Sequence, residues 1–273
     1  MKFVEMLKAR WRAADTLLCV GLDPDRARFP EHLRTSDDSI FEFCRAIVDA
    51  TAEFVCAFKP QIAYFASAGA EDALQRLIAY VRAAYPAVPV ILDAKRGDMA
   101  STAQHYAREV FERYNAHAVT LSPYLGFDSI EAYLAYADRG AFLLCRTSNP
   151  GGDDLQMLES GGEYLYERVA QLAANWNRSG QLGLVVGATY PNELARVREL
   201  VGDMPLLVPG IGAQGGDVEA SVKAGQTADG TGIVVNSSRA IIYASQGEDF
   251  ALAAKRAAQS ARDQINRYRF AKV

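Results

Sequence analysis

The stretch Val90-Ile-Leu-Asp-Ala-Lys95 is a short apolar run with β-branched residues that ends in charged side chains, and residues 101–113 follow it with helical spacing. The same pairing of strand and helix recurs along the chain. Seven further apolar runs predict strands at 17–23, 55–59, 118–122, 141–147, 182–188, 206–210 and 232–236. Other helices are predicted at 40–54, 71–84, 163–177 and about 250–268.

This alternation indicates the fold class. Nearly continuous apolar strands separated by helices are typical of a parallel sheet whose two faces are both covered. Eight such units in 273 residues fit a closed (β/α)8 TIM barrel, an α/β fold, better than an open sheet. We expect one domain over residues 1–273, with an N-terminal helix at about 2–13 that plugs the lower mouth of the barrel or packs against the last helix.

Composition and charge exclude several classes of function. The 33 acidic residues outnumber the 29 basic ones, which disfavours a nucleic-acid-binding protein and favours small-molecule ligands. No apolar run reaches the roughly 20 residues that span a bilayer, and the first residues alternate charged and apolar side chains, so we expect no membrane segment and a cytoplasmic protein. The three histidines lack the spacing of metal ligands, so no metal is predicted.

Charged residues follow three of the predicted strands. Asp93 and Lys95 share one face of their strand because strand side chains alternate, and Asp98 follows just beyond the strand end. Taken alone, this cluster is more typical of a salt-bridged strand end with Asp98 capping a helix. However, Asp23 and Lys59 end the first two strands in the same way. Reactive groups of such barrels lie at the carboxyl ends of strands, so one converging charged site is predicted.

A glycine-rich loop follows the seventh strand. Residues 209–217 contain G-x-G-x-x-G at Gly210, Gly212 and Gly215, which in a dinucleotide-binding protein would instead follow the first strand. After the seventh strand of a barrel, such a loop commonly binds phosphate through its backbone amides. Arg239, after the eighth strand, is placed to bind the same phosphate, although a tight turn and a surface arginine would give the same pattern.

These motifs together resemble a known family. Asp93-Ala-Lys-Arg-Gly-Asp98, with Lys59 in FKPQIAYF and Asp23 in GLDP, is similar to orotidine 5′-phosphate decarboxylase of the longer bacterial type. The resemblance runs through all eight predicted strands. It implies decarboxylation of orotidine 5′-monophosphate to uridine 5′-monophosphate and CO₂, the last step of pyrimidine nucleotide biosynthesis, with no metal or organic cofactor.

The resemblance implies a role for each charged residue. Lys95 offsets the charge that develops at C6 of the pyrimidine and then donates a proton to it. Asp93 lies beside the substrate carboxylate, while Lys59 and Asp98 complete an alternating array that keeps Lys95 protonated. Asp23 binds ribose hydroxyls and orients Lys59.

Further residues match the substrate-binding positions of the family. Arg239 resembles its phosphate-binding arginine, and Gln214 resembles a residue of a mobile loop that bridges phosphate and pyrimidine. Pro209 and Gly210 occupy the start of that loop. Ser238 precedes the arginine where many shorter members have glycine, so we treat it as secondary to Arg239.

Two more positions complete the implied site. Ser148 matches a serine that bonds the pyrimidine edge, and it begins an irregular segment of roughly 15 residues, longer than the usual connection. Thr102, like Asp98, matches a residue that enters the active site of a partner subunit. The resemblance therefore implies a homodimer with shared sites.

Two alternatives remain. Related barrels, 3-keto-L-gulonate 6-phosphate decarboxylase and hexulose-phosphate synthase, share the Asp-x-Lys-x-x-Asp signature but need Mg²⁺ and carry a glutamate near the second strand, where this chain has Lys59. A non-catalytic barrel that senses a nucleotide would keep the phosphate loops. Intact Lys95 and Asp98 argue against it.

Overall fold

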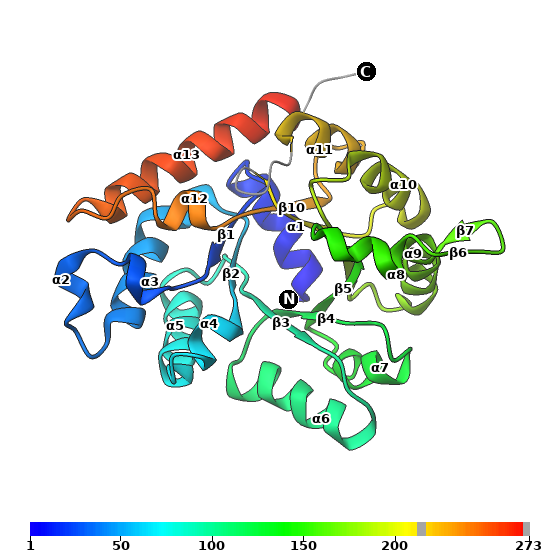
Figure 1. Cartoon of the computed structure of the whole chain (residues 1–273), viewed down its shortest axis with the longest axis horizontal. Coiled ribbons are helices and arrows are strands. Elements are labelled where there is room, and N and C mark those ends of the chain that lie inside the picture. The colour runs from blue at the N-terminus through cyan, green and yellow to red at the C-terminus, as the bar shows by residue number, and fades with distance from the viewer. Residues whose placement is uncertain (212–216, 270–273) are drawn as a thin grey trace.

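Eight parallel strands form one sheet that curves into a barrel, and helices surround it (Figure 1). The computed structural model describes residues 1–211 and 217–269. The strands are β1 (Leu18–Leu22), β2 (Ala57–Pro60), β3 (Ile91–Arg96), β4 (Ala118–Leu121), β5 (Gly140–Arg146), β8 (Leu182–Val186), β9 (Leu206–Pro209) and β10 (Ile233–Ser237). Each predicted strand is present, and the TIM-barrel prediction is confirmed.

The order of the strands explains how the barrel closes. In the sheet the order is β2-β1-β10-β9-β8-β5-β4-β3, so the first strand pairs with the last. Single bridges between Phe58 and Val90 and between Gln61 and Asp93 join β2 to β3 and complete the ring. The carboxyl ends of all eight strands therefore meet at one mouth of the barrel.

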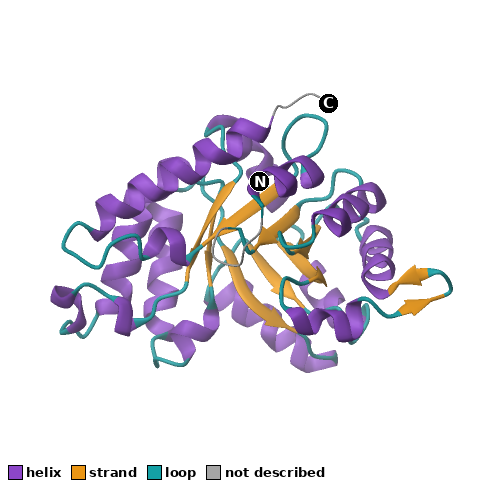
Figure 2. Ribbon diagram, turned by 45° about the horizontal axis from the view of Figure 1, so that its top comes forward, coloured by secondary structure: helices purple, strands orange, loops and turns teal. Residues whose placement is uncertain are grey.

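Helices cover the outside of the barrel (Figure 2). They are amphipathic, and their buried apolar side chains belong to the same core cluster as the strands. The α-helices are α1 (Phe3–Ala13), α2 (Glu31–Arg34), α3 (Ser39–Thr51), α4 (Ile62–Ala66), α5 (Glu71–Ala84), α6 (Ala100–Arg108), α7 (Asp128–Leu134), α8 (Asp153–Gln156), α9 (Leu165–Trp176), α10 (Pro191–Val201), α11 (Val218–Gly225), α12 (Arg239–Ile242) and α13 (Phe250–Arg269). Short 3-10 turns lie at Arg26–Arg28, Ala52–Phe54 and Pro150–Gly152, and a π-helical turn, Glu109–Arg113, extends α6.

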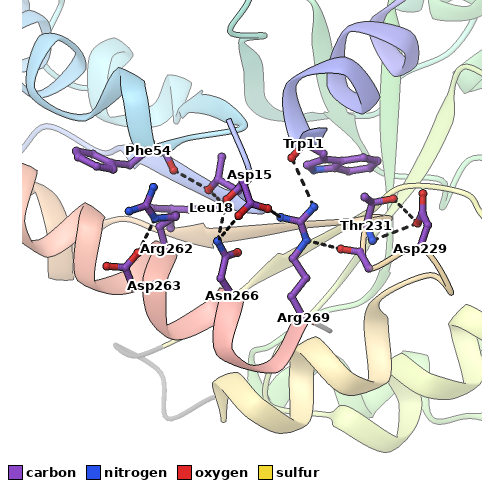
Figure 3. A network of polar contacts seen from close by, with 12 residues as sticks. Trp11, Asp15, Leu18, Phe54, Asp229, Thr231, Arg262, Asp263, Asn266 and Arg269 are labelled. Atoms are coloured by element: carbon purple, nitrogen blue, oxygen red, sulfur yellow. Dashed lines mark hydrogen bonds and ion pairs between the residues drawn. The ribbon is translucent and has the colours of Figure 1, made fainter. Parts of the chain in front are cut away.

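Helix α1 closes the amino-end mouth of the barrel. The ring of Phe3 packs edge-on against Phe142 of β5, with 5.8 Å between ring centroids. A Cβ atom on Gly140 would lie 2.2 Å from Cδ1 of the Phe3 ring, so glycine is required at the start of β5. At the other end of α1, Arg269 of α13 bonds Asp15 and the Trp11 carbonyl (Figure 3). Thus α1 plugs the lower mouth and also contacts the last helix.

The segment after β5 differs from the prediction. We expected about 15 irregular residues there, but this segment forms a 3-10 turn, helix α8 and a hairpin of β6 (Glu159–Ser160) and β7 (Glu163–Tyr164) that projects from the barrel in Figure 2. Helix α9 then begins at Leu165 rather than at 163. Hydrogen bonds within this segment pair backbone N–H and C=O groups, which favours regular structure over the irregular loop that we predicted.

In the described part of the chain, no helix has both the length and the apolar character needed to cross a bilayer.

Candidate active site

A cavity of about 510 Å³ opens at the carboxyl-end mouth of the barrel. That volume suits a small-molecule ligand. Most of the predicted site residues line this cavity together: Asp23, Lys59, Asp93, Lys95, Ser148, Pro209, Gly210, Ser238 and Arg239. They come from six different strands or the loops after them, as parallel strands that end at one mouth require.

Asp93 lies between two lysines at one side of the cavity. Its Oδ2 accepts a hydrogen bond from Lys59 Nζ at 2.9 Å, and its Oδ1 accepts one from Lys95 Nζ at 2.7 Å. Lys59 and Asp93 are only 5% and 7% exposed, whereas the side chain of Lys95 is 47% exposed toward the opening. Lys95 is thus the member of the trio that a ligand in the cavity reaches.

The buried pair is held in its charged form. Burial alone would raise the pKa of Asp93, but the charges of Lys59 and Lys95 outweigh it and hold that pKa well below its ordinary value. Burial likewise acts to lower the pKa of Lys59, and Asp93 and Asp23 overcome it and raise that pKa. The ammonium and carboxylate forms therefore coexist at neutral pH.

Strand β3 departs from regular geometry where it carries the trio. Leu92 pairs with Val119, but Arg96 pairs with Leu121, so a bulge lies between them and the regular alternation that we predicted for this strand does not hold. Lys95 has a φ of 45°, which costs a non-glycine residue roughly 1–2 kcal/mol. Strain of this kind is typical of functional sites.

Thr120 of β4 supports this bulge, and the sequence reasoning missed it. Its Oγ1 accepts hydrogen bonds from the backbone N–H of Ala94 at 3.1 Å and of Lys95 at 3.0 Å. The same hydroxyl donates to Asp93 Oδ1 at 2.8 Å. A single polar residue near the carboxyl end of an apolar strand was the available signal.

Asp23 and Ser238 join the first and last strands next to Lys59, because β1 pairs with both β2 and β10. The Ser238 hydroxyl donates to Asp23 Oδ2 at 2.5 Å, and Ser238 Oγ also lies 3.1 Å from the Gly21 carbonyl oxygen. A Cβ on Gly21 would lie 2.8 Å from the Cβ of Ser238, so glycine permits this close approach. Asp23 Oδ1 is buried without a hydrogen-bond partner in the described residues, which leaves an acceptor for a ligand hydroxyl.

The predicted phosphate-binding residues lie at the ends of β9 and β10. Pro209 ends β9, and Gly210 has a φ of 99°, a conformation that favours glycine. Arg239 begins α12, and its exposed side chain lines the same cavity. Gln214 falls outside the described residues.

The loop after β5 carries Ser148 into the cavity. Arg146, which is 1% exposed, anchors this loop by bonding Asp153 Oδ1 at 2.6 Å, and it stacks on the Tyr190 ring with 3.6 Å from Cζ to the ring centroid. A Cβ on Gly187 of the neighbouring strand end would lie 2.8 Å from the Cα of Ser148. Sequence reasoning missed Arg146, because an arginine inside an apolar run does not reveal which later residue pairs with it.

Asp98 and Thr102 lie elsewhere. Among the described residues they do not line the cavity: Asp98 accepts a hydrogen bond from the Met99 backbone N–H at 2.8 Å, and Thr102 is exposed on α6. One chain by itself therefore brings together the trio of Lys59, Asp93 and Lys95, but not the second aspartate of the Asp-x-Lys-x-x-Asp motif.

This arrangement favours chemistry on an anionic ligand. One end of the cavity presents an accessible ammonium group whose position is fixed by a buried carboxylate, and the other end presents an arginine and a glycine-rich loop start. A molecule with a phosphate at one end and a reacting centre at the other would fit between them. An ammonium at the reacting centre stabilises developing negative charge and carries a transferable proton.

Comparison with known proteins gives a consistent result. Residues 16–254 match the orotidine 5′-phosphate decarboxylase / HUMPS family. An orotidine 5′-phosphate decarboxylase of Ralstonia nicotianae is 66% identical over 270 residues, which are 98% of this chain and 100% of that relative.

Solved structures agree. The OMP decarboxylase of Leishmania donovani is 43% identical, has a TM-score of 0.86, and the match covers 99% of this chain and 100% of that chain. The UMP synthase of the same organism is 45% identical with a TM-score of 0.86, and the match covers all of this chain but 57% of that one. Each match includes the strands that carry the cavity residues.

Proposed function

Because the chain belongs to the orotidine 5′-phosphate decarboxylase / HUMPS family, we propose that Lys95 is the proton donor of the reaction that it catalyses. That reaction is the decarboxylation of orotidine 5′-monophosphate to uridine 5′-monophosphate and CO₂ in pyrimidine biosynthesis. The observation that carries the proposal is the exposed Nζ of Lys95, held 2.7 Å from buried Asp93 inside the cavity.

The chemistry explains why an ammonium is needed. When the bond between C6 and the carboxylate breaks, the electron pair stays on C6, and the pyrimidine ring does not delocalise it as an enolate. Stabilisation must therefore be electrostatic, and Lys95 supplies a positive charge at that position. Its Nζ then transfers a proton to C6, and the resulting neutral amine is reprotonated from solvent.

Substrate orientation follows from the remaining cavity residues. Arg239 and the loop that begins at Gly210 bind the phosphate, and the open Oδ1 of Asp23 accepts a ribose hydroxyl. Ser148, which also lines the cavity, bonds the pyrimidine edge. The phosphate is remote from C6. Binding it contributes to kcat because it holds the reacting end of the substrate in place.

We also propose that no metal takes part. Both oxygens of Asp93 already accept hydrogen bonds from ammonium groups, and Lys59 occupies the place where related Mg²⁺ enzymes carry a glutamate. A cation next to two lysines would be repelled.

The first experiment follows the absorbance of orotidine 5′-monophosphate with wild-type protein and with Lys95→Ala, both in EDTA. We expect full wild-type turnover and a loss of roughly 10²- to 10⁴-fold in the variant. Calorimetry should give an unchanged affinity of the variant for uridine 5′-monophosphate. Turnover by Lys95→Ala at the wild-type rate would refute the role of Lys95, and loss of wild-type turnover in EDTA would refute the metal-free reaction.

Exposed apolar side chains on the segments that follow β2, β3 and β4 support a homodimer with shared sites. Tyr64, Met99 and Tyr124 are 37%, 55% and 79% exposed, and they follow the neighbouring strands β2, β3 and β4. Large apolar side chains left exposed in this way are typical of a surface that another subunit covers. In a symmetric dimer, this face would bring Asp98 and Thr102 of each subunit toward the cavity of the other.

Mixing two inactive variants tests this arrangement. If Asp98 acts across the interface, heterodimers of Lys95→Ala and Asp98→Asn contain one intact site and one doubly altered site. After subunits exchange, about a quarter of all sites should regain activity. Mixtures that stay inactive although ultracentrifugation shows heterodimers would rule out shared sites.

A further inference from the structure

We propose that Thr120 is a positioning residue for the decarboxylation: its hydroxyl holds the backbone of Lys95 and the carboxylate of Asp93 in one fixed arrangement. The inference rests on the proposed role of Lys95. It concerns a residue that lies outside the Asp-x-Lys-x-x-Asp motif, on the neighbouring strand.

The donor and acceptor types of the groups settle the direction of each hydrogen bond around Thr120. The N–H groups of Ala94 and Lys95 are donors only, so the threonine oxygen must accept from both, at 3.1 and 3.0 Å. The single hydroxyl proton is then left for Asp93 Oδ1 at 2.8 Å, and an ionised carboxylate only accepts. All three bonds are therefore possible at once, and no other assignment satisfies them.

The two amide bonds hold the bulge of β3 together. Between Leu92 and Arg96 this strand leaves its register with β4. The regular hydrogen bonds between β3 and β4 therefore do not include these amides. Lys95 has the left-handed φ of 45°, a conformation that needs support from its surroundings. The Thr120 oxygen provides that support from inside the barrel wall, where the residue is 1% exposed.

The third bond fixes how the carboxylate is turned. Asp93 Oδ1 is shared by the Thr120 hydroxyl and by Lys95 Nζ, while Oδ2 faces Lys59. Rotation of the carboxylate would move the ammonium of Lys95, because the two are bonded at 2.7 Å. Thr120 thus acts on Lys95 twice, through its main chain and through its ion-pair partner.

The support itself is rigid. Thr120 lies in a central strand, paired with Phe142 of β5, and a β-branched side chain in a strand has few rotamers. Small errors in the position of a reacting group are costly for rate even where binding is unaffected. We therefore expect the Thr120 hydroxyl to matter for the chemical step more than for nucleotide affinity.

The test compares Thr120→Val, which removes the hydroxyl at nearly constant shape, with Thr120→Ser, which keeps it. For Thr120→Val we expect kcat to fall roughly 10- to 100-fold, with KM and the affinity for uridine 5′-monophosphate changed by no more than about threefold. Exchange of the C6 proton of uridine 5′-monophosphate in D₂O should slow in parallel. Thr120→Ser should keep kcat within about threefold of wild type, because the hydroxyl is retained.

Thr16→Val is the matched control. Thr16 is also fully buried, and its hydroxyl bonds the backbone of Phe54 and Leu18 at the other end of the barrel. This variant should lose stability without losing kcat per folded molecule. If Thr120→Val fails to fold, Thr120→Cys, whose thiol is a weak donor and acceptor, should show the same selective loss of kcat to a smaller degree.

Three results would overturn the inference: wild-type kcat in Thr120→Val, an equal loss of nucleotide affinity, or the same kcat defect in Thr120→Ser. Lys95→Ala separates this inference from the proposed function. If Lys95→Ala is inactive while Thr120→Val is fully active, only the role of Thr120 fails. If Lys95→Ala itself turns over, the proposed proton donor fails first.

Discussion

The two ends of the barrel use charged side chains in opposite ways. At the amino end, arginines donate to backbone carbonyls in the loops that precede the strands: Arg10 to Val55, Arg139 to Ala116, Arg198 to Met204 and Gly232, and Arg269 to Gly230. At the carboxyl end, Lys59 and Lys95 bond Asp93, and these groups line an open cavity.

The difference separates structural charge from functional charge. A guanidinium that donates to several carbonyls satisfies backbone acceptors in the loops, so few of its N–H groups remain for a ligand. At the carboxyl end, Asp23 Oδ1 and Asn236 Oδ1 are buried without partners in the described residues, and both side chains line the cavity. Acceptors left open next to a cavity are suited to binding a ligand.

Replacing Asp93 should have the largest effect and should damage only the carboxyl end. Asp93→Asn leaves two ammonium groups around a neutral amide, so they repel each other and Lys95 moves from its position. We expect kcat to fall by about a thousandfold, as is found when a single electrostatic group of an active site is lost. Steady-state kinetics measures the loss.

Asp15→Asn is the comparison at the amino end, where Asp15 bonds Arg269 at 2.7 Å. Its kcat should equal that of wild type. A comparable loss of kcat in Asp15→Asn would mean that the two ends are not functionally separate.

Arg198→Met should damage only the amino end. This side chain bonds the carbonyls of Gly202, Met204, Gly225 and Gly232, and burial lowers its pKa to about 10, so it remains charged at neutral pH. Removing it leaves carbonyls unpaired, and the free energy of unfolding should drop by roughly 3 kcal/mol or more. Urea unfolding measures this change.

Arg12→Met is its control on the same face, because Arg12 is exposed and lies 3.9 Å from Asp229. A weak surface pair of this kind contributes less than about 1 kcal/mol. Equal destabilisation by the two variants would contradict the structural role of Arg198.

Arg239→Ala should weaken binding at one end of the cavity while leaving the amino-end contacts intact. Loss of a charge-assisted contact to phosphate predicts a roughly 10- to 100-fold lower affinity for uridine 5′-monophosphate. The affinity for uridine, which has no phosphate, should not change. Calorimetry measures both affinities. An equal loss of affinity for uridine would show that Arg239 does not bind the phosphate.

His117 should give the smallest effect, a pH dependence of stability that originates at the amino end. Burial, with Arg82 and Arg139 nearby, lowers its pKa to about 3. Between that value and the ordinary value of about 6.5, the unfolded chain binds a proton that the folded chain does not, so acid favours unfolding. This residue should cost about 1 kcal/mol of stability between pH 7 and pH 5.5.

Urea unfolding of wild type and His117→Gln at both pH values measures that difference. The variant should lose less stability on acidification than wild type does. Identical pH dependence in the two proteins would refute the assignment.

Much of the fold and part of the site could be predicted because they follow from local patterns. Apolar runs of strand length mark all eight strands, and Asp23, Lys59 and Lys95 are recognisable as charges at strand ends. Their meeting in one cavity follows from the parallel topology. Homodimer formation and the residue roles stay predictions.

The rest depended on contacts that no local pattern indicates. Thr120 matters because β3 bulges opposite it, and a bulge has no signature in the alternation of Val90 to Lys95. Likewise, the segment after β5 is ordered because buried Arg146 bonds Asp153 and Gln156. Only the three-dimensional structure shows which partner a buried arginine uses.

The bond between Asp23 and Ser238 joins residues 215 positions apart in the chain. Because β1 also pairs with β10, the cavity has no complete wall until both ends of the barrel have been synthesised. At ribosomal speeds of about 5–20 residues per second, roughly 10–40 s separate the appearance of these two side chains. Nucleotide binding is therefore a property of the finished chain, and the ligand selectively stabilises molecules whose first and last strands have met.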